Sequence, residues 1–166
     1  MEGSRLAVDP GFASLARRMR TLGLDVIICQ ARTPVEVLVF CRKERRILLT
    51  KDKSLADVFK RYNQECLLVG TEEEGLKIVL ERFGTGQSRC PFCNEELLSV
   101  QREEVLGKVP VYVFLSMEKF SKCPKCGRIF WKGSHLRWIE EVIGHDPRRT
   151  EENTGNKDCG KRHEHS

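Results

Sequence analysis

Four of the eight cysteines in this 166-residue chain form two Cys-x-x-Cys motifs, Cys90 with Cys93 and Cys123 with Cys126. Each motif makes a tight turn that directs two thiolates toward one point, and two such turns supply the four sulfur ligands that structural zinc prefers. The alternatives are two redox pairs or two disulfides, but redox motifs occur singly and disulfides need an oxidising compartment. A four-sulfur site has no open coordination position, so we expect the zinc to stabilise structure and not to catalyse a reaction.

Three carboxylates could carry a second kind of chemistry. Asp9 directly follows the first expected strand, Glu36 lies in the first helical turn after the second, and Asp52 follows the third. Ligands of an open parallel sheet bind beyond the carboxyl ends of its strands. Carboxylates that converge there repel each other unless a cation is bound, and Mg²⁺ or Mn²⁺ suits such an oxygen-only site.

Each carboxylate also has a structural interpretation that the sequence leaves open. Asp9 precedes Pro-Gly and could form a turn or cap a helix. Glu36 could be the capping-box partner of Thr33, and Asp52 could cap the third helix, although Ser54 offers a cap of its own.

The elements that would position these groups alternate along residues 5–84. Short apolar strands are separated by segments with helical periodicity and capping signals. The expected strands are 6–8, 26–29, 47–50 and 66–69, and the expected helices are 12–22, 33–46, 54–61 and 71–83. This order predicts an α/β fold with a doubly wound parallel sheet, covered by helices on both faces.

Residues 87–144 carry both cysteine motifs and predict a small zinc ribbon. A glycine-rich hinge at 84–87 precedes it, residues 111–115 are expected to form a strand, and a closing helix is expected from Ser134. Residues 145–166 are polar and are expected to be disordered. The expected domains are therefore 1–86, 87–144 and the tail 145–166.

Composition limits the class of protein. Hydrophobic residues make up 40% of the chain and charged residues 32%, with a net charge of +5, which permits an anionic partner without requiring one. No apolar run reaches membrane-spanning length and no signal segment follows Met1, so we expect a cytoplasmic or nuclear protein that is not secreted. Cys29, Cys41 and Cys66 lie in apolar contexts and are expected to be core residues.

Several segments together resemble a PIN-like ribonuclease domain, specifically the C-terminal RNase domain of the Mut-seven exonuclease homologues. The likeness spans roughly residues 5–143. It is carried by Leu6–Asp9, Leu15–Asp25, Arg46–Asp52, Ser88–Cys90, the second Cys-x-x-Cys motif and Trp131–His135. The resemblance implies a PIN-like nuclease domain over 1–86, metal-dependent RNA cleavage, and a zinc ribbon after it. By the same resemblance Asp9, Glu36 and Asp52 match the acidic positions.

Five basic side chains are candidates for RNA binding. Arg17 and Arg20 match the family's arginine positions on the first helix, although they could equally form a solvated basic face. Lys51 neighbours Asp52, while Lys132 and His135 belong to the motif that trails the ribbon.

Together with the acidic residues, the resemblance implies a divalent-metal-dependent ribonuclease whose structural zinc ribbon aids RNA binding. PIN nucleases often carry a further acid just after the Thr-x-Asp motif, where this chain has Lys53 and Ser54. That difference supports the alternative of a non-catalytic RNA-binding or protein-docking module. The expected partners are RNA and a larger exonuclease or RNA-processing assembly, with no membrane.

Overall fold

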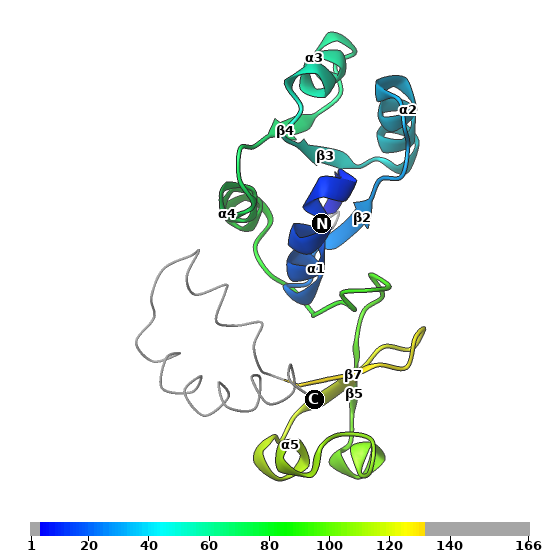
Figure 1. Cartoon of the computed structure of the whole chain (residues 1–166), viewed down its shortest axis with the longest axis vertical. Coiled ribbons are helices and arrows are strands. Elements are labelled where there is room, and N and C mark those ends of the chain that lie inside the picture. The colour runs from blue at the N-terminus through cyan, green and yellow to red at the C-terminus, as the bar shows by residue number, and fades with distance from the viewer. Residues whose placement is uncertain (1–3, 132–166) are drawn as a thin grey trace. The chain divides into compact units, whose positions relative to one another are not determined.

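The computed structural model describes residues 4–131 of the chain. The chain divides into two compact units, Met1–Asn94 and Glu95–Ser166 (Figure 1). The first Cys-x-x-Cys motif therefore lies in the first unit, although the sequence had assigned residues 87–94 to the ribbon.

The first unit alternates strands with helices, and the predicted order is confirmed. Its strands are β1 (Arg5–Val8), β2 (Asp25–Ile28), β3 (Ile47–Thr50) and β4 (Cys66–Leu68). Its helices are the 3-10 turn η1 (Pro10–Phe12), α1 (Ala13–Thr21), α2 (Pro34–Glu44), α3 (Lys53–Arg61) and α4 (Glu72–Phe83).

The four strands form one parallel sheet in the order β2-β1-β3-β4. α1 contacts α4 and α2 contacts α3, so the helices form two layers, one on each face of the sheet (Figure 1). This arrangement confirms the predicted doubly wound α/β class.

Alternating strand residues supply the core on the two faces. Ala7 and Leu48 are paired in register and belong to a buried cluster with α2 and α3 residues, among them Phe59. On the other face, Gly75 of α4 packs so closely on Leu49 and Leu15 that an added Cβ would lie 3.1 and 3.2 Å from their side chains. The period-two pattern therefore buries both faces.

The second unit contains a three-stranded antiparallel sheet, β5-β6-β7. Its elements are β5 (Leu98–Val100), the 3-10 turn η2 (Arg102–Val105), α5 (Val111–Ser116), β6 (Phe120–Lys122) and β7 (Ile129–Trp131). Val105, Val113, Met117 and Phe120 form its small core.

The predicted strand at 111–115 is wrong, because these residues form α5. Their β-branched and aromatic side chains favour a strand when read alone. The helix instead buries Val113 in the small core, where Met117, the residue after the helix, also packs, and Pro110 precedes the first turn. Tertiary packing therefore overrides the local preference.

Some predictions fall on residues outside the described range. These are the closing helix from Ser134, the candidates Lys132 and His135, and the tail 145–166. Within residues 4–131, no helix combines the length and apolar character needed to cross a membrane.

Candidate functional site

The two cysteine motifs form turns of matching geometry, which we call the first knuckle (90–94) and the second knuckle (123–127). In each, the backbone N–H four residues after the first cysteine donates to that cysteine's carbonyl oxygen at 2.9 Å. The donating residues are Asn94 and Gly127, with positive φ values of 64° and 76°. Glycine adopts this conformation freely and asparagine is the side chain that tolerates it best.

The sulfur atoms of Cys90, Cys93, Cys123 and Cys126 all lie within 4.8 Å of one another. A tetrahedral zinc ion with bonds of about 2.3 Å would set its sulfurs about 3.8 Å apart, so the four residues fit such an ion. The backbone N–H of Cys126 also points at the Cys123 sulfur, at 3.5 Å, a contact that supports a thiolate. The predicted cluster of four cysteines is confirmed.

Arg20 anchors the first knuckle to α1 and β2. Its side chain is only 7% exposed, and its guanidinium donates to the carbonyl oxygens of Val26 at 2.9 Å and Pro91 at 2.7 Å. Burial lowers the pKa of Arg20. The sequence names Arg20 as a candidate RNA contact, and the structure places its guanidinium on two buried carbonyls, where it has a structural role.

We expect Arg20→Gln to lower the free energy of unfolding by about 2–4 kcal/mol, because two buried carbonyl groups lose a charged donor. Arg17→Gln is the matched control, since Arg17 lies one turn earlier on the exposed face of α1 and its loss should cost less than about 0.5 kcal/mol. Urea denaturation of both variants measures the difference. Equal losses of stability would contradict the structural role of Arg20.

Asn94 completes the connection between the knuckle and the sheet. Its side-chain oxygen accepts from the backbone N–H of Val26 at 3.2 Å, and its amide nitrogen donates to Asp25 at 2.7 Å. Asp25 also pairs with the buried Arg46 at 3.0 Å. Burial by itself would raise the pKa of Asp25, but the hydrogen bonds from Arg46 and Asn94 outweigh it and leave this pKa below its ordinary value.

The lowered pKa of Asp25 predicts a pH dependence of stability. A carboxyl group with a depressed folded-state pKa stabilises the protein above its ordinary pKa of about 3.9, and this contribution is lost as the pH falls through the folded-state pKa. Asp25→Asn should therefore lower Tm clearly at neutral pH and progressively less below about pH 4. Thermal melts across that range check this, and a pH-independent difference would contradict it.

Cys29, Cys41 and Cys66 behave as core residues, as predicted. Cys29 and Cys41 are buried and Cys66 is partly buried. Burial raises the pKa of Cys41 to about 12 and that of Cys66 to about 11, so both remain protonated thiols at neutral pH.

Asp9 and Asp52 are connected through Thr50. The buried Thr50 hydroxyl at the end of β3 donates to Oδ2 of Asp9 and accepts the backbone N–H of Asp52 at 3.1 Å. Oδ1 of Asp52 caps α3 by accepting from the N–H groups of Ser54 and Leu55 at 2.9 and 3.3 Å. Asp52, and not Ser54, is therefore the N-cap of α3.

This connected pair lies at the point where the sheet changes direction. β1 and β3 are neighbours, but the chain leaves β1 toward β2 on one side and leaves β3 toward β4 on the other. In doubly wound sheets of this order, the crevice beyond the carboxyl ends of these two strands is the usual ligand site. Asp9 and Asp52 follow these two strands.

Glu36 takes part in a capping box at the start of α2. Its Oε2 accepts from the backbone N–H groups of Arg32 and Thr33 at 2.9 and 3.3 Å, while Thr33 caps the N–H of Glu36 at 3.2 Å. This is the capping box that the sequence allowed as an alternative. Among residues 4–131, the four cysteines are the ligand cluster that the structure shows, and the three carboxylates do not form a comparable group.

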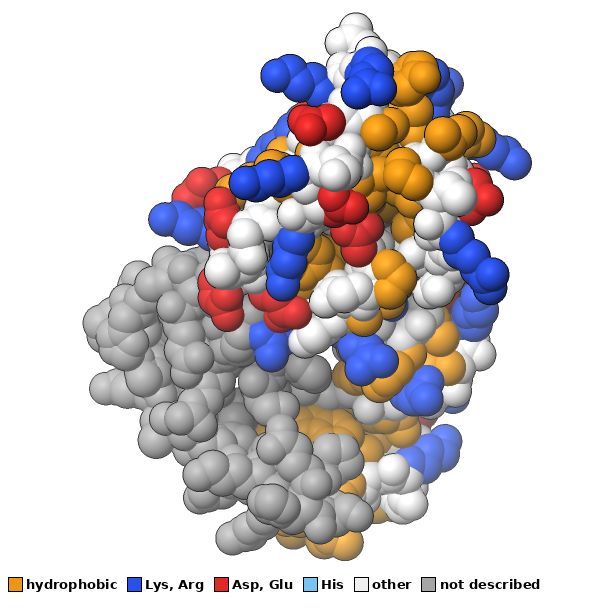
Figure 2. Space-filling model, turned by 45° about the horizontal axis from the view of Figure 1, so that its top comes forward, with side chains coloured by type: hydrophobic (Ala, Val, Ile, Leu, Met, Phe, Trp, Pro, Cys, Tyr) orange, Lys and Arg blue, Asp and Glu red, His pale blue; other side chains and the backbone are white. Residues whose placement is uncertain are grey.

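Two of the predicted cations lie beside aromatic rings. Lys51 is exposed, with its Nζ 4.9 Å from the ring centroid of Phe12, directly after the Asp9 turn. Arg17 is exposed and lies 5.4 Å from the ring of Phe92 in the first knuckle. On the face shown in Figure 2, acidic and basic side chains are interspersed, and no single large basic patch marks an RNA site on that face.

Sequence reasoning missed two residues of these sites. The sequence places Thr50 at the end of a strand and in the Thr-x-Asp motif but assigns it no role, although a hydroxyl at this position can lie between the two carboxylates. Asn94 had no assigned role. Its role could have been inferred from its position, which is equivalent to that of Gly127 in the second knuckle. Asparagine at such a positive-φ position adds hydrogen-bonding groups that glycine lacks.

The comparison with known families agrees with this architecture. A family model described as the Mut7-C RNAse domain matches residues 4–143, which include the parallel sheet, Asp9, Asp52 and both knuckles. No curated protein matches the chain. The match covers well over half of the sequence, and the chain therefore belongs to the Mut7-C RNAse domain family.

Proposed function

We propose that this chain is a divalent-metal-dependent ribonuclease that hydrolyses RNA phosphodiester bonds, with a zinc ribbon that aids RNA binding. Family membership supports a nuclease-related function. The observation that supports metal-dependent hydrolysis is the Asp9–Thr50–Asp52 connection beyond the neighbouring strands β1 and β3. Zinc-bound, reduced cysteines fit an activity in the cytoplasm or nucleus.

The two carboxylates are suited to share a hard cation. Within the described residues, hydrogen bonds use Oδ2 of Asp9 and Oδ1 of Asp52, so each carboxylate has one oxygen left for a ligand. Oxygen donors of this kind match Mg²⁺ or Mn²⁺. The ion, when bound, would supply Lewis acidity that polarises the phosphodiester and activates water.

The remaining residues have assigned parts in this proposal. Thr50 fixes the orientation of the Asp9 carboxylate, and Lys51 offers a positive charge beside a phosphate oxygen. Glu36, on the flank of the site after β2, assists metal binding or orients water with the oxygen that the capping box does not use. Arg17 binds the RNA backbone, and the family resemblance adds Lys132 and His135.

A cleavage assay with product analysis tests the proposal. The zinc-loaded chain is incubated with end-labelled single-stranded RNA, with Mg²⁺, with Mn²⁺ or without either ion. The proposal requires cleavage only with the added ion and products that end in a 3′-hydroxyl or 5′-phosphate, as hydrolysis by activated water gives. Cleavage without the ion that leaves 2′,3′-cyclic phosphates would instead indicate a contaminating metal-independent ribonuclease.

A non-catalytic module is the second candidate. It is favoured by Lys53 and Ser54 in place of a further acid and by the engagement of Glu36 in the capping box. Such a module would bind RNA or dock onto a larger exonuclease or RNA-processing assembly. RNA binding without cleavage under every metal condition would favour it.

A further inference from the structure

An aromatic side chain projects from the first knuckle and is paired with a cation. Phe92 is 51% exposed, although it lies between Cys90 and Pro91 on one side and Cys93 on the other. The guanidinium carbon of Arg17 is 5.4 Å from the centroid of its ring. A cation beside an exposed ring offers a π-face and a positive charge at one place, which is the combination that single-stranded nucleic acid binds.

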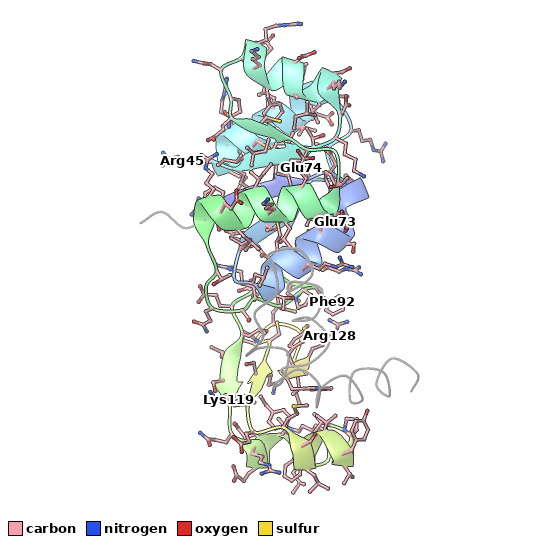
Figure 3. All side chains as sticks on the ribbon, turned by 90° about the vertical axis from the view of Figure 1, so that its left-hand side faces the viewer. Arg45, Glu73, Glu74, Phe92, Lys119 and Arg128 are labelled. Atoms are coloured by element: carbon pink, nitrogen blue, oxygen red, sulfur yellow. The ribbon has the colours of Figure 1, made fainter. Side chains whose placement is uncertain are left out.

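The position of the pair relates it to the acidic edge of the sheet. Asp9 is followed by the 3-10 turn η1, and Arg17 lies in the second turn of α1, which begins at Ala13. Figure 3 shows Phe92 on the same side of the view as Glu73, which lies in the first turn of α4, and opposite Arg45, which precedes β3. Asn94 anchors the knuckle backbone at the amino end of β2, and the Phe92 ring lies against Arg17, which is one turn closer than Arg20 to the N-terminus of α1.

The exposed face of α1, between the Asp9 turn and Phe92, carries polar side chains. Ser14 and Arg17 are exposed on α1, whereas Leu15, Ala16 and Met19 are buried on its opposite face. A purely apolar partner would have to desolvate the Arg17 charge to cover Phe92, which is costly. A nucleotide meets both groups without that cost, since its base stacks on the ring and its phosphate pairs with the guanidinium.

We propose that Phe92 and Arg17 form a base-stacking and phosphate-binding subsite for single-stranded RNA, a short distance along the strand from the bond positioned at Asp9 and Asp52. The first knuckle thereby contributes an RNA contact in addition to its zinc ligands. This inference rests on the proposed function for its choice of RNA as ligand and for the place of the reacting phosphate.

The test measures RNA binding by the zinc-loaded full-length chain without added Mg²⁺ or Mn²⁺. The probe is a fluorescent uridine-rich RNA of about 10 nucleotides, a length within the usual site size for single strands. Phe92→Leu should raise Kd by about 5- to 100-fold, the range for loss of one stacked base. Phe92→Trp should retain binding, because it keeps an aromatic face.

Two controls separate stacking from general effects. Tyr62→Leu removes another aromatic side chain of the first unit, 53% exposed at the end of α3, and should leave Kd unchanged. Arg17→Gln should reduce the slope of log Kd against log salt by about one, the contribution of one phosphate contact. Phe92→Leu should leave this slope unchanged.

An RNA carrying abasic positions completes the design and does not depend on any variant folding. Wild-type protein should bind it more weakly than the intact RNA, and Phe92→Leu should weaken this binding no further. Equal affinity of the wild type for abasic and intact RNA would overturn the inference, as would equal effects of Phe92→Leu and Tyr62→Leu. Cleavage is scored separately with Mg²⁺, so stacking without cleavage would reject only the proposed hydrolysis.

Discussion

Asp9→Asn should reduce metal-dependent RNA cleavage by about 100-fold or more, the scale on which loss of a charge-stabilising group lowers catalysis. Asparagine keeps the shape of the side chain and can still accept the Thr50 hydroxyl, but it removes the negative charge that would attract the cation. Initial rates with labelled RNA across a Mg²⁺ titration measure the loss. The Tm of Asp9→Asn should not fall, because the substitution removes the repulsion between the Asp9 and Asp52 carboxylates.

Matched variants make this result specific to the Asp9–Asp52 pair. Asp52→Asn should lose activity to a similar extent while preserving the cap on α3, since asparagine caps helices as well as aspartate does. Glu36→Gln keeps the capping box, so it isolates the charge of Glu36, and we expect a smaller loss than for Asp9→Asn. Undiminished cleavage by folded Asp9→Asn would place the reaction elsewhere.

Removal of zinc should unfold the second unit and leave the parallel sheet folded. Within the described residues 95–131, the second unit has a core cluster of four buried residues and three short strands, and so small a core needs a metal or disulfide to be stable. A structural zinc ion adds about 10–16 kcal/mol of apparent binding free energy at neutral pH, which acts as folding free energy. Cys123→Ser should therefore abolish stoichiometric zinc binding, and hydrogen exchange should show loss of protection in β5, β6 and β7 but not in β1 and β3.

The first knuckle should respond less than the second, because Arg20 and Asn94 tie it to α1 and β2 without the metal. Cys66→Ser is the matched control, because Cys66 lies outside the cluster of four cysteines. The Cys66→Ser protein should still bind one zinc ion per chain. Metal analysis and hydrogen exchange are applied to both variants. Full protection of β5 to β7 in a zinc-free Cys123→Ser protein would contradict a structural role for the metal.

The sequence contained enough information for the α/β architecture because its signals there are local. Apolar strands, helix caps and Gly23 after α1 each specify the backbone nearby, and the parallel order follows from the alternation. The cysteine cluster was equally accessible, since the Cys-x-x-Cys spacing itself makes the turn. The helix α5 was not accessible, because its β-branched residues become helical only through packing of Val113 and Met117.

Contacts between distant segments limited what could be predicted of the candidate sites. Arg20 looked like any arginine on a basic helix until its guanidinium was found on Pro91, 71 positions away in the sequence. The capping box of Glu36 was readable from Thr33, but the sequence could not show whether a cation also recruits this carboxylate. Thr50 gained its role only when β3 was placed beside β1.

The most direct test of the account is a crystal structure of the zinc-loaded chain soaked with Mn²⁺, with the ion located by its anomalous scattering. We predict one Mn²⁺ bound by carboxylate oxygens of both Asp9 and Asp52, and none in the Asp9→Asn protein. Mn²⁺ absent from this edge of the sheet at saturating concentration, or bound there equally well by Asp9→Asn, would contradict the account.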